Sequence, residues 1–288
     1  MEPTLESQHV QLVRSLAVGA LTEVFFALQE ARTPVVVKRL HRHLVHDPGA
    51  TAMFAHEVRL LECLSHPGIP GLLWQGRDLG RPVQVQRFHA GTPLDALVSR
   101  GVGPAASAAL VLGLLDVLEH VHGACDVDGV ALQVVHRDLG PPNVLVAPTG
   151  RVSLVDFGIA TSRWRPDPDR GVLKGTRGYM APEVITGEHP AEARSDLFVV
   201  GVLLFEAATG VRCFPGNAAA SMTACVEGAR PEAPLPPHLA GVIDRALHRD
   251  PAGRFATAAE MAQSLREAAA RDGFDPSPAA LQAALPPP

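Results

Sequence analysis

The chain has 288 residues, of which 47% are hydrophobic and 19% charged, a balance that predicts a folded protein with a sizeable core and excludes wholesale disorder. A formal net charge of −5 provides no chain-wide positive field, so we expect no nucleic acid among its partners. The four cysteines lack CxxC spacing, which favours neither a zinc site nor a disulfide framework.

The N-terminal residues do not have the pattern of a secretory signal. Glu2 and Glu6 stand where a basic patch would precede an apolar run. The most apolar later run, residues 197–205, is followed by Glu206 and is too short to span a bilayer. We therefore expect a cytoplasmic protein with no membrane span, whose input arrives through a regulatory protein partner.

Two patterns of apolar residues follow each other along the chain. Short β-rich runs predict strands at residues 10–18, 23–29, 34–40 and 82–88, with one helix at residues 52–64. From residue 94, helical spacing predicts helices at residues 105–121, 196–209, 239–247 and 258–270. These patterns predict an α+β chain with a small β-rich N-lobe with one helix, at about 10–88, and a larger, mainly helical C-lobe, at about 94–270.

Glycine and proline mark the ends of these regions. Gly91 and Pro93 lie in residues 89–93, which we expect to act as a hinge. Residues 271–288 are rich in Pro and Ala and have no adequate helical or strand period, so we expect a mobile C-terminal tail.

Lysine is rare in this chain. All but two of its 25 basic residues are arginine, and the exceptions are Lys38 and Lys174. Lysine is hard to replace where a compact ammonium is needed. Lys38 closes the apolar run Val35-Val36-Val37, which predicts a buried strand that delivers one charge to its end.

Four short motifs, each weak alone, occur in one order and in a matching context of strands and helices. They are Val35-Val36-Val37-Lys38, His136-Arg137-Asp138-Leu139 with Asn143, Asp156-Phe157-Gly158, and Ala181-Pro182-Glu183. On these residues the chain resembles the bacterial eukaryotic-like (Hanks-type) serine/threonine protein kinases over about residues 10–270. The resemblance implies the two-lobed protein-kinase-like fold, with a protein kinase domain at 10–270.

The resemblance also implies a reaction and the residues that perform it. The reaction is transfer of the γ-phosphoryl group of ATP to Ser or Thr hydroxyls of protein substrates, with Mg²⁺, or alternatively Mn²⁺, as the metal. Asp138 corresponds to the group that accepts the proton of the substrate hydroxyl, and Asn143 and Asp156 to the metal ligands. Lys38 corresponds to the residue that holds the phosphates, and Glu57 to the carboxylate that orients it.

Further residues match supporting positions of the family. Gly19 lies in the phosphate-binding loop, and Val24 and Leu145 correspond to residues on either side of the adenine ring. The remaining matches are Thr176 beside the substrate hydroxyl, Asp196 as a brace for the catalytic loop, and Glu183 with Arg254 as a buried ion pair.

The chain departs from the family pattern at two loops. Ala17 and Thr22 replace two glycines of the phosphate-binding loop, and Gly140 replaces the lysine of the catalytic loop. The alternative function is therefore a pseudokinase, a nucleotide-binding scaffold or regulatory binding partner without phosphotransfer. The complete set of catalytic residues favours an active enzyme. A small-molecule phosphotransferase is disfavoured by residues 175–183, which resemble a segment that docks protein substrates.

Regulation by phosphorylation has few acceptors in the segment between Gly158 and Ala181. Its Ser and Thr residues are Thr161, Ser162 and Thr176. A phosphate on this segment would find a partner in Arg137. We predict that phosphorylation of this segment is weak or unnecessary.

Overall fold

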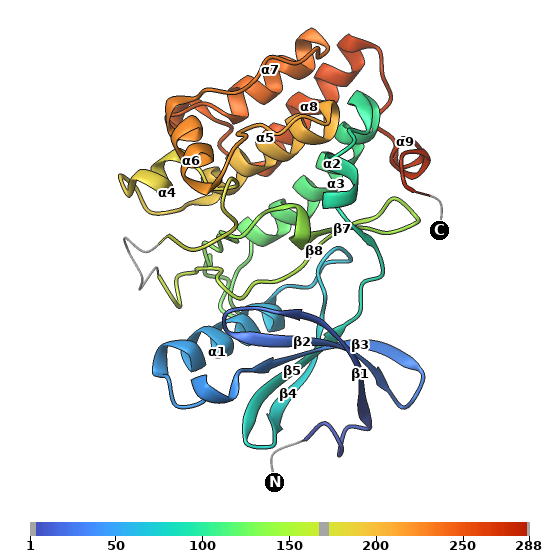
Figure 1. The fold of residues 1–288 in the computed structure, drawn as a ribbon, viewed down its shortest axis with the longest axis vertical. Helices are drawn as coiled ribbons and strands as arrows, with labels where there is room; N and C mark the ends of the chain where they lie inside the picture. The colour runs from blue at the N-terminus through green and yellow to red at the C-terminus, as the bar shows by residue number, and fades with distance from the viewer. Residues whose placement is uncertain (1–3, 167–172, 287–288) are drawn as a thin grey trace. The chain divides into compact units, whose positions relative to one another are not determined.

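A five-stranded antiparallel sheet and one long helix form the first unit of the chain, Met1–His89 (Figure 1). The computed structural model describes residues 4–166 and 173–286. The strand order is β1-β2-β3-β5-β4, which puts β3 at the centre of the sheet. The bounds are β1 Val10–Val18, β2 Thr22–Gln29, β3 Thr33–Leu40, β4 Leu72–Asp78 and β5 Arg81–Arg87. Strand β4 was not predicted, because a bulge and a mixture of polar and apolar residues hide its period.

The central strand β3 sends side chains to both faces of the sheet, because successive residues of a strand point to opposite sides. Val35 and Val37 are fully buried in an apolar cluster on one face, together with Val83 and Val85 of β5. Lys38 follows Val37 and belongs to the opposite face. The buried run before Lys38 thus places its ammonium near the end of a rigid strand.

Helix α1, Pro48–Cys63, packs against the end of β3. Phe54 of the helix and Leu40 of the strand lie in one apolar cluster. Asp47 caps the helix by accepting a 2.6 Å hydrogen bond from the backbone N–H of Ala50, which satisfies one of the unpaired donors of the first turn. Cap and cluster together fix the helix on the sheet.

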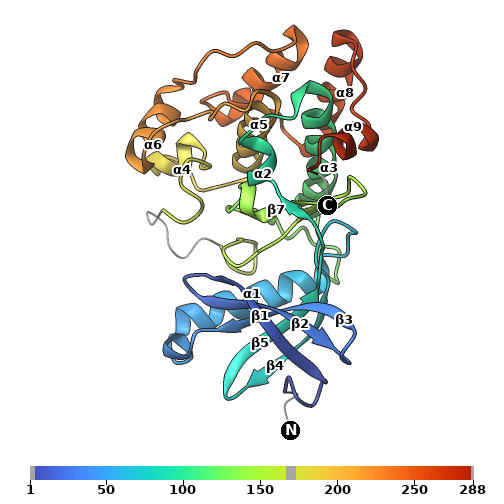
Figure 2. The same ribbon diagram turned by 45° about the vertical axis from the view of Figure 1, so that its right-hand side comes forward.

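The second unit, Ala90–Pro288, is mainly helical, with α3 packed against α5, α8 and α9 (Figure 2). Helices α3, α5, α7 and α8 correspond to the four predicted helices, whereas the short α2 and α4 and the alanine-rich α6 were not predicted. The bounds are α2 Asp95–Val98, α3 Gly103–His122, α4 Pro182–Thr186, α5 Ala193–Thr209, α6 Ala218–Glu227, α7 Pro237–Ala246, α8 Ala258–Asp272 and α9 Pro278–Ala283.

Among the helices in residues 4–166 and 173–286, only α3 is long and apolar enough to cross a membrane. Of its most apolar 18 residues, 56% are buried inside the fold. Leu110, Leu114 and Leu115 are fully buried. Packing in the core of the second unit therefore accounts for its apolar composition.

A small antiparallel sheet ordered β6-β7-β8 belongs to the second unit. Its strands are β6 Thr92–Pro93, β7 Val144–Val146 and β8 Val152–Leu154. Strand β6 lies in residues 89–93, which we expected to be a hinge, and the division between the two units falls between His89 and Ala90. The β7–β8 hairpin places Asn143 just before one strand and Asp156 just after the other.

The C-terminal residues fold back onto the second unit, so the expectation of a mobile tail was wrong for the part that the structure describes. Ser277 caps α9 by accepting a hydrogen bond from the N–H of Ala280. Helix α9 packs against α3, and the side chain of Leu281 on α9 is only 1% exposed. Nε2 of Gln282 donates to the carbonyl of Thr149 in the β7–β8 turn, at 2.5 Å. A helix of six residues is too short to show a period, and its burial depends on a surface built by distant residues. The last two residues of the expected tail lie outside the described residues.

Candidate active site

The turn between β1 and β2 holds Gly19, the glycine predicted to approach phosphate. Its N–H donates to the carbonyl of Thr22 at 2.9 Å, and its own carbonyl is hydrogen-bonded to Nε2 of His41 at 2.8 Å. A Cβ at Gly19 would meet only the carbonyl oxygen of Thr22, 3.6 Å away, which is an ordinary contact. The protein itself therefore leaves room for a side chain here, and any requirement for glycine comes from a ligand.

Lys38 and Glu57 form a buried ion pair, with Nζ 2.5 Å from Oε1. The other carboxylate oxygen of Glu57 accepts a 2.9 Å hydrogen bond from Nε2 of Gln84 on β5. Because both oxygens of Glu57 have donors, the carboxylate is fixed and holds the ammonium in one place. The ion pair was expected from the resemblance, but the contact of Gln84 was not, although a glutamine between Val83 and Val85 in an apolar strand is a detectable signal of a buried polar role.

Asp196, near the start of α5, holds the backbone of the loop at residues 136–143. Its carboxylate accepts hydrogen bonds from the N–H groups of His136, at 2.9 Å, and Arg137, at 3.1 Å. Nε2 of His122 on α3 lies 2.9 Å from the same carboxylate. Burial favours the neutral acid, but the hydrogen bond and charge of His122 outweigh burial and hold the pKa of Asp196 below its usual value. Asp196 is therefore ionised and braces the loop, as the resemblance implies.

Asp138 has a donor on each of its carboxylate oxygens. The hydroxyl of Thr176 donates to Oδ1 at 2.7 Å, and Nδ2 of Asn143 donates to Oδ2 at 3.0 Å. Nδ2 of Asn143 also lies 2.8 Å from the backbone carbonyl of Asp138. Each carboxylate oxygen keeps a second lone pair, so Asp138 is a positioned carboxylate that can still accept a proton.

Thr176 comes this close to Asp138 because the residue before it is glycine. Gly175 has φ +122°, a conformation that side-chain-bearing residues rarely adopt. A Cβ at Gly175 would lie 2.8 Å from the carbonyl oxygen of Arg137. This neighbour is backbone, which cannot rotate away, so the contact between the two segments requires glycine.

The β7–β8 hairpin connects the two predicted metal ligands. The N–H of Val155 donates to the carbonyl of Asn143 at 2.9 Å, and Asp156 is the next residue along the chain. Asp156 has φ +67°, and its Oδ1 accepts a 3.1 Å hydrogen bond from the N–H of Gly158. One hydrogen-bonded pair of the hairpin thus fixes the spacing between the backbones of Asn143 and Asp156.

The oxygen atoms of Asn143 and Asp156 fit magnesium, which prefers oxygen ligands. Asn143 uses its amide nitrogen to bind Asp138, and its Oδ1 accepts no hydrogen bond from any residue that the structure describes. No three His, Cys, Asp or Glu side chains gather into a metal-binding group within the described part of the chain. This agrees with a magnesium site that is completed by waters and substrate phosphates rather than by a protein cage.

His136 is a buried residue of the site for which the sequence predicted no role. Its ring lies 4.8 Å from the ring of Phe157, and its Nδ1 accepts a hydrogen bond from the N–H of Asp138 at 3.3 Å. Burial lowers the pKa of His136, despite the opposing charges of Asp196 and Asp138. A neutral His136 adds no positive charge beside the carboxylate of Asp138.

The two residues expected to contact the adenine ring belong to different units. Val24 lies on β2, opposite Lys38, and Leu145 lies on β7, opposite Pro93 of β6. Both are half-buried. Their shared contact with adenine stays a prediction.

Glu183 and Arg254 form the buried ion pair that was expected from the sequence. Two parallel contacts join them, Nη1 to Oε1 at 2.9 Å and Nη2 to Oε2 at 2.7 Å, and each residue is 2% exposed. The hydroxyl of Ser195 also donates to Glu183, at 2.7 Å. Burial alone would raise the pKa of Glu183, but the hydrogen bonds from Arg254 and Ser195 lower it below its usual value.

The hydroxyls of the segment between Gly158 and Ala181 have little access to solvent or are already bonded. Thr161 is 7% exposed and Ser162 is 3% exposed. Thr161 also exchanges two backbone hydrogen bonds with Val135. Weak or unnecessary phosphorylation of the segment stays a prediction.

The fold brings the eight predicted site residues into two groups. The first unit holds Gly19, Val24, Lys38 and Glu57, and the second holds Asp138, Asn143, Leu145 and Asp156.

Comparison with known proteins identifies the family. Residues 10–265 match the protein kinase domain. The chain is 33% identical to the tyrosine-protein kinase MasK of Myxococcus xanthus over 273 residues, which cover 88% of this chain and 42% of that protein. It is 33% identical to the serine/threonine-protein kinase PknA of Mycobacterium tuberculosis over 280 residues, which cover 94% of this chain and 63% of that protein. It is also 30% identical to the serine/threonine-protein kinase Pkn1 of Myxococcus xanthus over 273 residues, which cover 90% and 38% of the two chains.

The chain therefore belongs to the protein kinase domain family. It spans less than two thirds of the length of each of these three relatives.

Proposed function

We propose that this chain is a serine/threonine protein kinase, which transfers the γ-phosphoryl group of ATP to Ser or Thr hydroxyls of protein substrates. The proposal depends on the fixed position of the Asp138 carboxylate. Thr176 donates a hydrogen bond to one of its oxygens and Asn143 donates to the other. The names of PknA and Pkn1 support this acceptor class, whereas MasK is named a tyrosine kinase. Thr176 favours Ser and Thr, because it resembles the threonine that serine/threonine kinases carry beside the substrate hydroxyl.

In the proposed reaction the acceptor oxygen forms a bond to the γ-phosphorus, while the bond from that phosphorus to the bridging oxygen breaks. ADP leaves with the electron pair of the broken bond, and the acceptor proton goes to Asp138. Lys38, held by Glu57, binds phosphate oxygens of ATP. Asn143 and Asp156 would hold a magnesium ion, which would supply positive charge against the phosphates.

The competing proposal is a pseudokinase that binds nucleotide or partners without transferring phosphate. Two departures from the family pattern favour the pseudokinase: Gly140 stands where the family has the loop lysine, and the β1–β2 turn has a single glycine, Gly19. The buried ion pair of Lys38 and Glu57 speaks against it, because burying two charges is costly and a scaffold has no chemical need for them.

Transfer of label from γ-labelled ATP distinguishes these two functions. The assay contains magnesium or manganese, with the chain itself and a generic basic protein as acceptors. We expect incorporation that disappears in Asp138→Asn and Asp156→Ala and falls strongly in Lys38→Met. Asp128→Asn, which changes an exposed carboxylate outside the site, should behave like the parent.

Absence of incorporation in the parent would overturn the kinase proposal. If ATP nevertheless raised the temperature of unfolding of the parent, and less so that of Lys38→Met, the pseudokinase would take its place. Equal incorporation by the parent and Asp138→Asn would contradict the role of Asp138.

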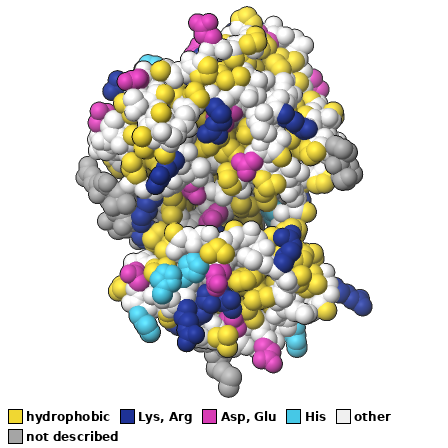
Figure 3. All heavy atoms as spheres, in the orientation of Figure 1, with side chains coloured by type: hydrophobic (Ala, Val, Ile, Leu, Met, Phe, Trp, Pro, Cys, Tyr) yellow, Lys and Arg dark blue, Asp and Glu magenta, His cyan; other side chains and the backbone are white. Residues whose placement is uncertain are grey.

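ATP and protein substrates, rather than nucleic acid, are the partners in this proposal. Figure 3 shows acidic and basic side chains intermixed on the face in view, without a continuous basic stripe.

We further propose that the protein acts in the cytoplasm, supported by the burial of the apolar helix α3 within its unit. Recovery of the protein in a membrane fraction would contradict this location. The regulatory protein partner stays a prediction.

A further inference from the structure

A β-hairpin at residues 124–132 connects α3 to the loop that contains Asp138, and the proposed reaction gives it no role. Three pairs of residues build this 124–132 hairpin: Ala124 with Leu132, Cys125 with Ala131, and Asp126 with Val130. Its three-residue turn ends at Gly129, whose φ of +78° is the left-handed conformation that such turns require. The connection is therefore an ordered element of the second unit.

Asp126 is bound from two directions in this hairpin. Its Oδ1 accepts hydrogen bonds from the N–H groups of Asp128, at 3.1 Å, and Val130, at 2.9 Å. Its Oδ2 lies 3.0 Å from Nη2 of Arg163, which belongs to the segment at residues 158–181. The side chain of Asp126 is 11% exposed, whereas that of Arg163 is 48% exposed. The turn thus fixes the carboxylate in advance, and only the arginine side chain has to be ordered when the ion pair forms.

Main-chain hydrogen bonds join the same two parts of the chain. The N–H of Arg163 donates to the carbonyl of Leu132, at the end of the hairpin, at 2.7 Å. Two residues earlier, Thr161 exchanges hydrogen bonds of 2.9 and 3.0 Å with Val135. Arg163 is therefore held by its backbone and by its side chain, both on the 124–132 hairpin.

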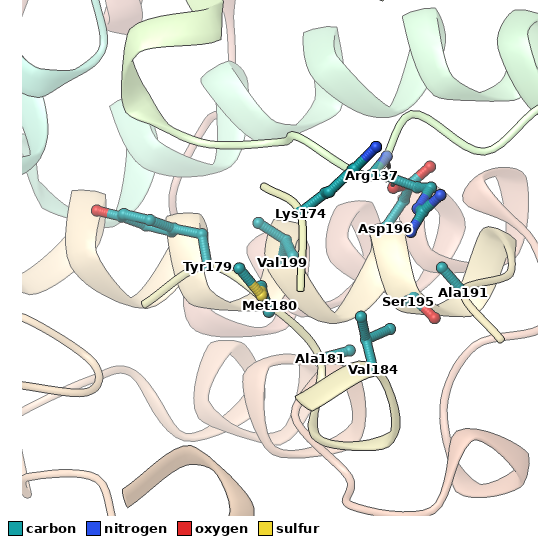
Figure 4. A pocket seen from close by; sticks show the side chains of 10 residues that line it. All are labelled: Arg137, Lys174, Tyr179, Met180, Ala181, Val184, Ala191, Ser195, Asp196 and Val199. Carbon is teal, nitrogen blue, oxygen red and sulfur yellow. Dashed lines mark hydrogen bonds between the residues drawn. The ribbon is translucent and has the colours of Figure 1, made fainter. Parts of the chain in front are cut away.

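The later part of the segment is held at a different place. The hydroxyl of Thr176 donates to Asp138 at 2.7 Å. Lys174 and Arg137 both line a small pocket, together with Val199 of α5 (Figure 4). These contacts belong to residues 174–181, so the 124–132 hairpin acts on the early part of the segment and leaves the later part to others.

The ion pair of Asp126 and Arg163 has the chemistry by which a phosphate orders such a segment. Phosphorylation adds an anion that pairs with an arginine elsewhere in the protein. Here the arginine belongs to the segment, and the hairpin supplies the anion. Either arrangement gives a charge-assisted hydrogen bond from a guanidinium to an anionic oxygen. Thr161 and Ser162, the hydroxyls nearest to Arg163 in sequence, are buried. The early part of the segment thus has its anion without phosphorylation.

We propose that Asp126 is a positioning residue: through its ion pair with Arg163, the 124–132 hairpin keeps residues 158–166 ordered, so that phosphotransfer requires no phosphate on the segment. Asp126 acts through the segment and not on the reacting atoms. This inference rests on the proposed kinase function and adds the regulation of that function to it.

Hydrogen exchange followed by mass spectrometry measures the order of the segment without nucleotide or phosphotransfer. Asp126→Asn keeps an oxygen for the N–H groups of the turn but removes the charge, and Arg163→Met removes the guanidinium. For an ion pair near the surface, we expect the backbone N–H groups of residues 161–163 to exchange about 5-fold faster in each variant. The double variant should exchange no faster than either single variant, because the pair is already broken. Arg163→Lys keeps a positive charge and should lie closer to the parent.

Two matched variants control for the loss of a charge. Asp128→Asn removes an exposed carboxylate from the same turn, and Arg266→Met removes an exposed guanidinium from α8. In both, residues 161–163 should exchange like the parent. Thermal unfolding of each variant verifies that it is folded.

Kinetics connect the order of the segment to the reaction. The parent is treated with a phosphatase until mass spectrometry finds no phosphate on residues 158–181, and we expect its activity to remain. Asp126→Asn and Arg163→Met should lower kcat/KM for the protein acceptor by about 5-fold, in proportion to the faster exchange. Arg163→Lys should lower it less. The KM for ATP should be unchanged in all three variants, because the hairpin contacts the segment and not the residues that bind phosphate.

Equal exchange of residues 161–163 in the parent and Asp126→Asn would overturn the proposal, as would additive effects in the double variant. The same acceleration in Asp128→Asn would also overturn it, because the effect would then not belong to the ion pair. Loss of activity on removal of phosphate would contradict the proposed independence from phosphorylation. Equal phosphotransfer by the parent and Asp126→Asn would refute the positioning role alone. Absence of phosphotransfer in the parent, with coupled exchange in the variants, would refute the kinase function alone.

Discussion

The hydroxyl of Thr176 donates a 2.7 Å hydrogen bond to Oδ1 of Asp138, although 38 positions separate the two residues in the sequence. Asp138 lies in the loop that Asp196 braces, and Thr176 belongs to the segment that leads to α4. The contact thus couples two segments of the second unit at the atom that would accept the substrate proton.

Replacing Thr176 with alanine removes this donor. A hydrogen bond to a charged group contributes about 1.5 to 3 kcal/mol, so we expect Thr176→Ala to lower kcat by about 10- to 100-fold. Thr176→Ser keeps the hydroxyl and should keep most of the activity. Steady-state phosphotransfer kinetics measure both variants. Equal kcat values for Thr176→Ala and the parent would mean that the contact does not position Asp138.

Gly140 offers a position at which the missing loop lysine can be restored. Its φ of 177° is extended backbone that any residue adopts. A Cβ at Gly140 would meet Thr176 at 3.4 to 3.5 Å, an ordinary contact. Since one preorganised donor changes kcat by about 100- to 1000-fold elsewhere, we expect Gly140→Lys to raise phosphotransfer by at least about 10-fold. Gly140→Met has similar length without the charge and should give no increase; an equal increase would exclude an effect of charge.

Substitutions at Gly175 and Gly187 distinguish the effect of a steric clash from the effect of a strained backbone conformation. Both have positive φ, +122° and +71°, but a Cβ at Gly187 meets nothing within 4 Å. Gly175→Ala forces a side chain against the carbonyl of Arg137 and should lower kcat in addition to costing about 1 to 3 kcal/mol of stability. Gly187→Ala should lower stability by about 1 kcal/mol and leave kcat intact. Chemical denaturation and kinetics test this pair, and similar kcat values for the two variants would contradict it.

The ion pair of Glu183 and Arg254 makes folding stability depend on pH. The pKa of Glu183 is lowered in the folded state, so its contribution is complete above its unfolded pKa of about 4.3 and is lost as pH falls through the lower folded pKa. Glu183→Gln leaves Arg254 buried without a charged partner and should cost about 3 to 5 kcal/mol at pH 7.

Denaturation of the parent and Glu183→Gln at several pH values tests this prediction. The difference in free energy of unfolding should be constant at neutral pH and shrink as the pH is lowered below about 4. A difference that grows on acidification would have the wrong sign.

One buried leucine, Leu281, contributes to the docking of α9. Leu281→Ala deletes a side chain that is 1% exposed, and we expect it to cost about 2 kcal/mol. Leu79→Ala makes the same change at a position that is 89% exposed and should cost little. Thermal unfolding compares the two variants. Equal transition temperatures for Leu281→Ala and the parent would mean that α9 adds no stability.

The sequence alone was sufficient for much of the fold and for the candidate site. The period of the apolar residues predicted strands β1, β2, β3 and β5 and helices α1, α3, α5, α7 and α8, because these elements bury one face and repeat it long enough to be read. The motifs around Lys38, Asp138 and Asp156 identified the chemistry, because phosphoryl transfer needs those residue types in that order. The ion pair of Glu183 and Arg254 was also expected from the resemblance.

Only the tertiary structure decided which distant groups meet. Three such contacts are the hydrogen bond from Gln84 to Glu57, the close approach of Gly175 to Arg137, and the pocket that Arg137 and Lys174 both line. Each of them joins residues that are far apart in sequence. Local patterns report how one segment buries its own side chains, but such contacts depend on how segments pack, and packing is set by the shape of the whole core. For the same reason, the six residues of α9 look like a tail in the sequence and become a helix only on the surface that α3 and the β7–β8 turn provide.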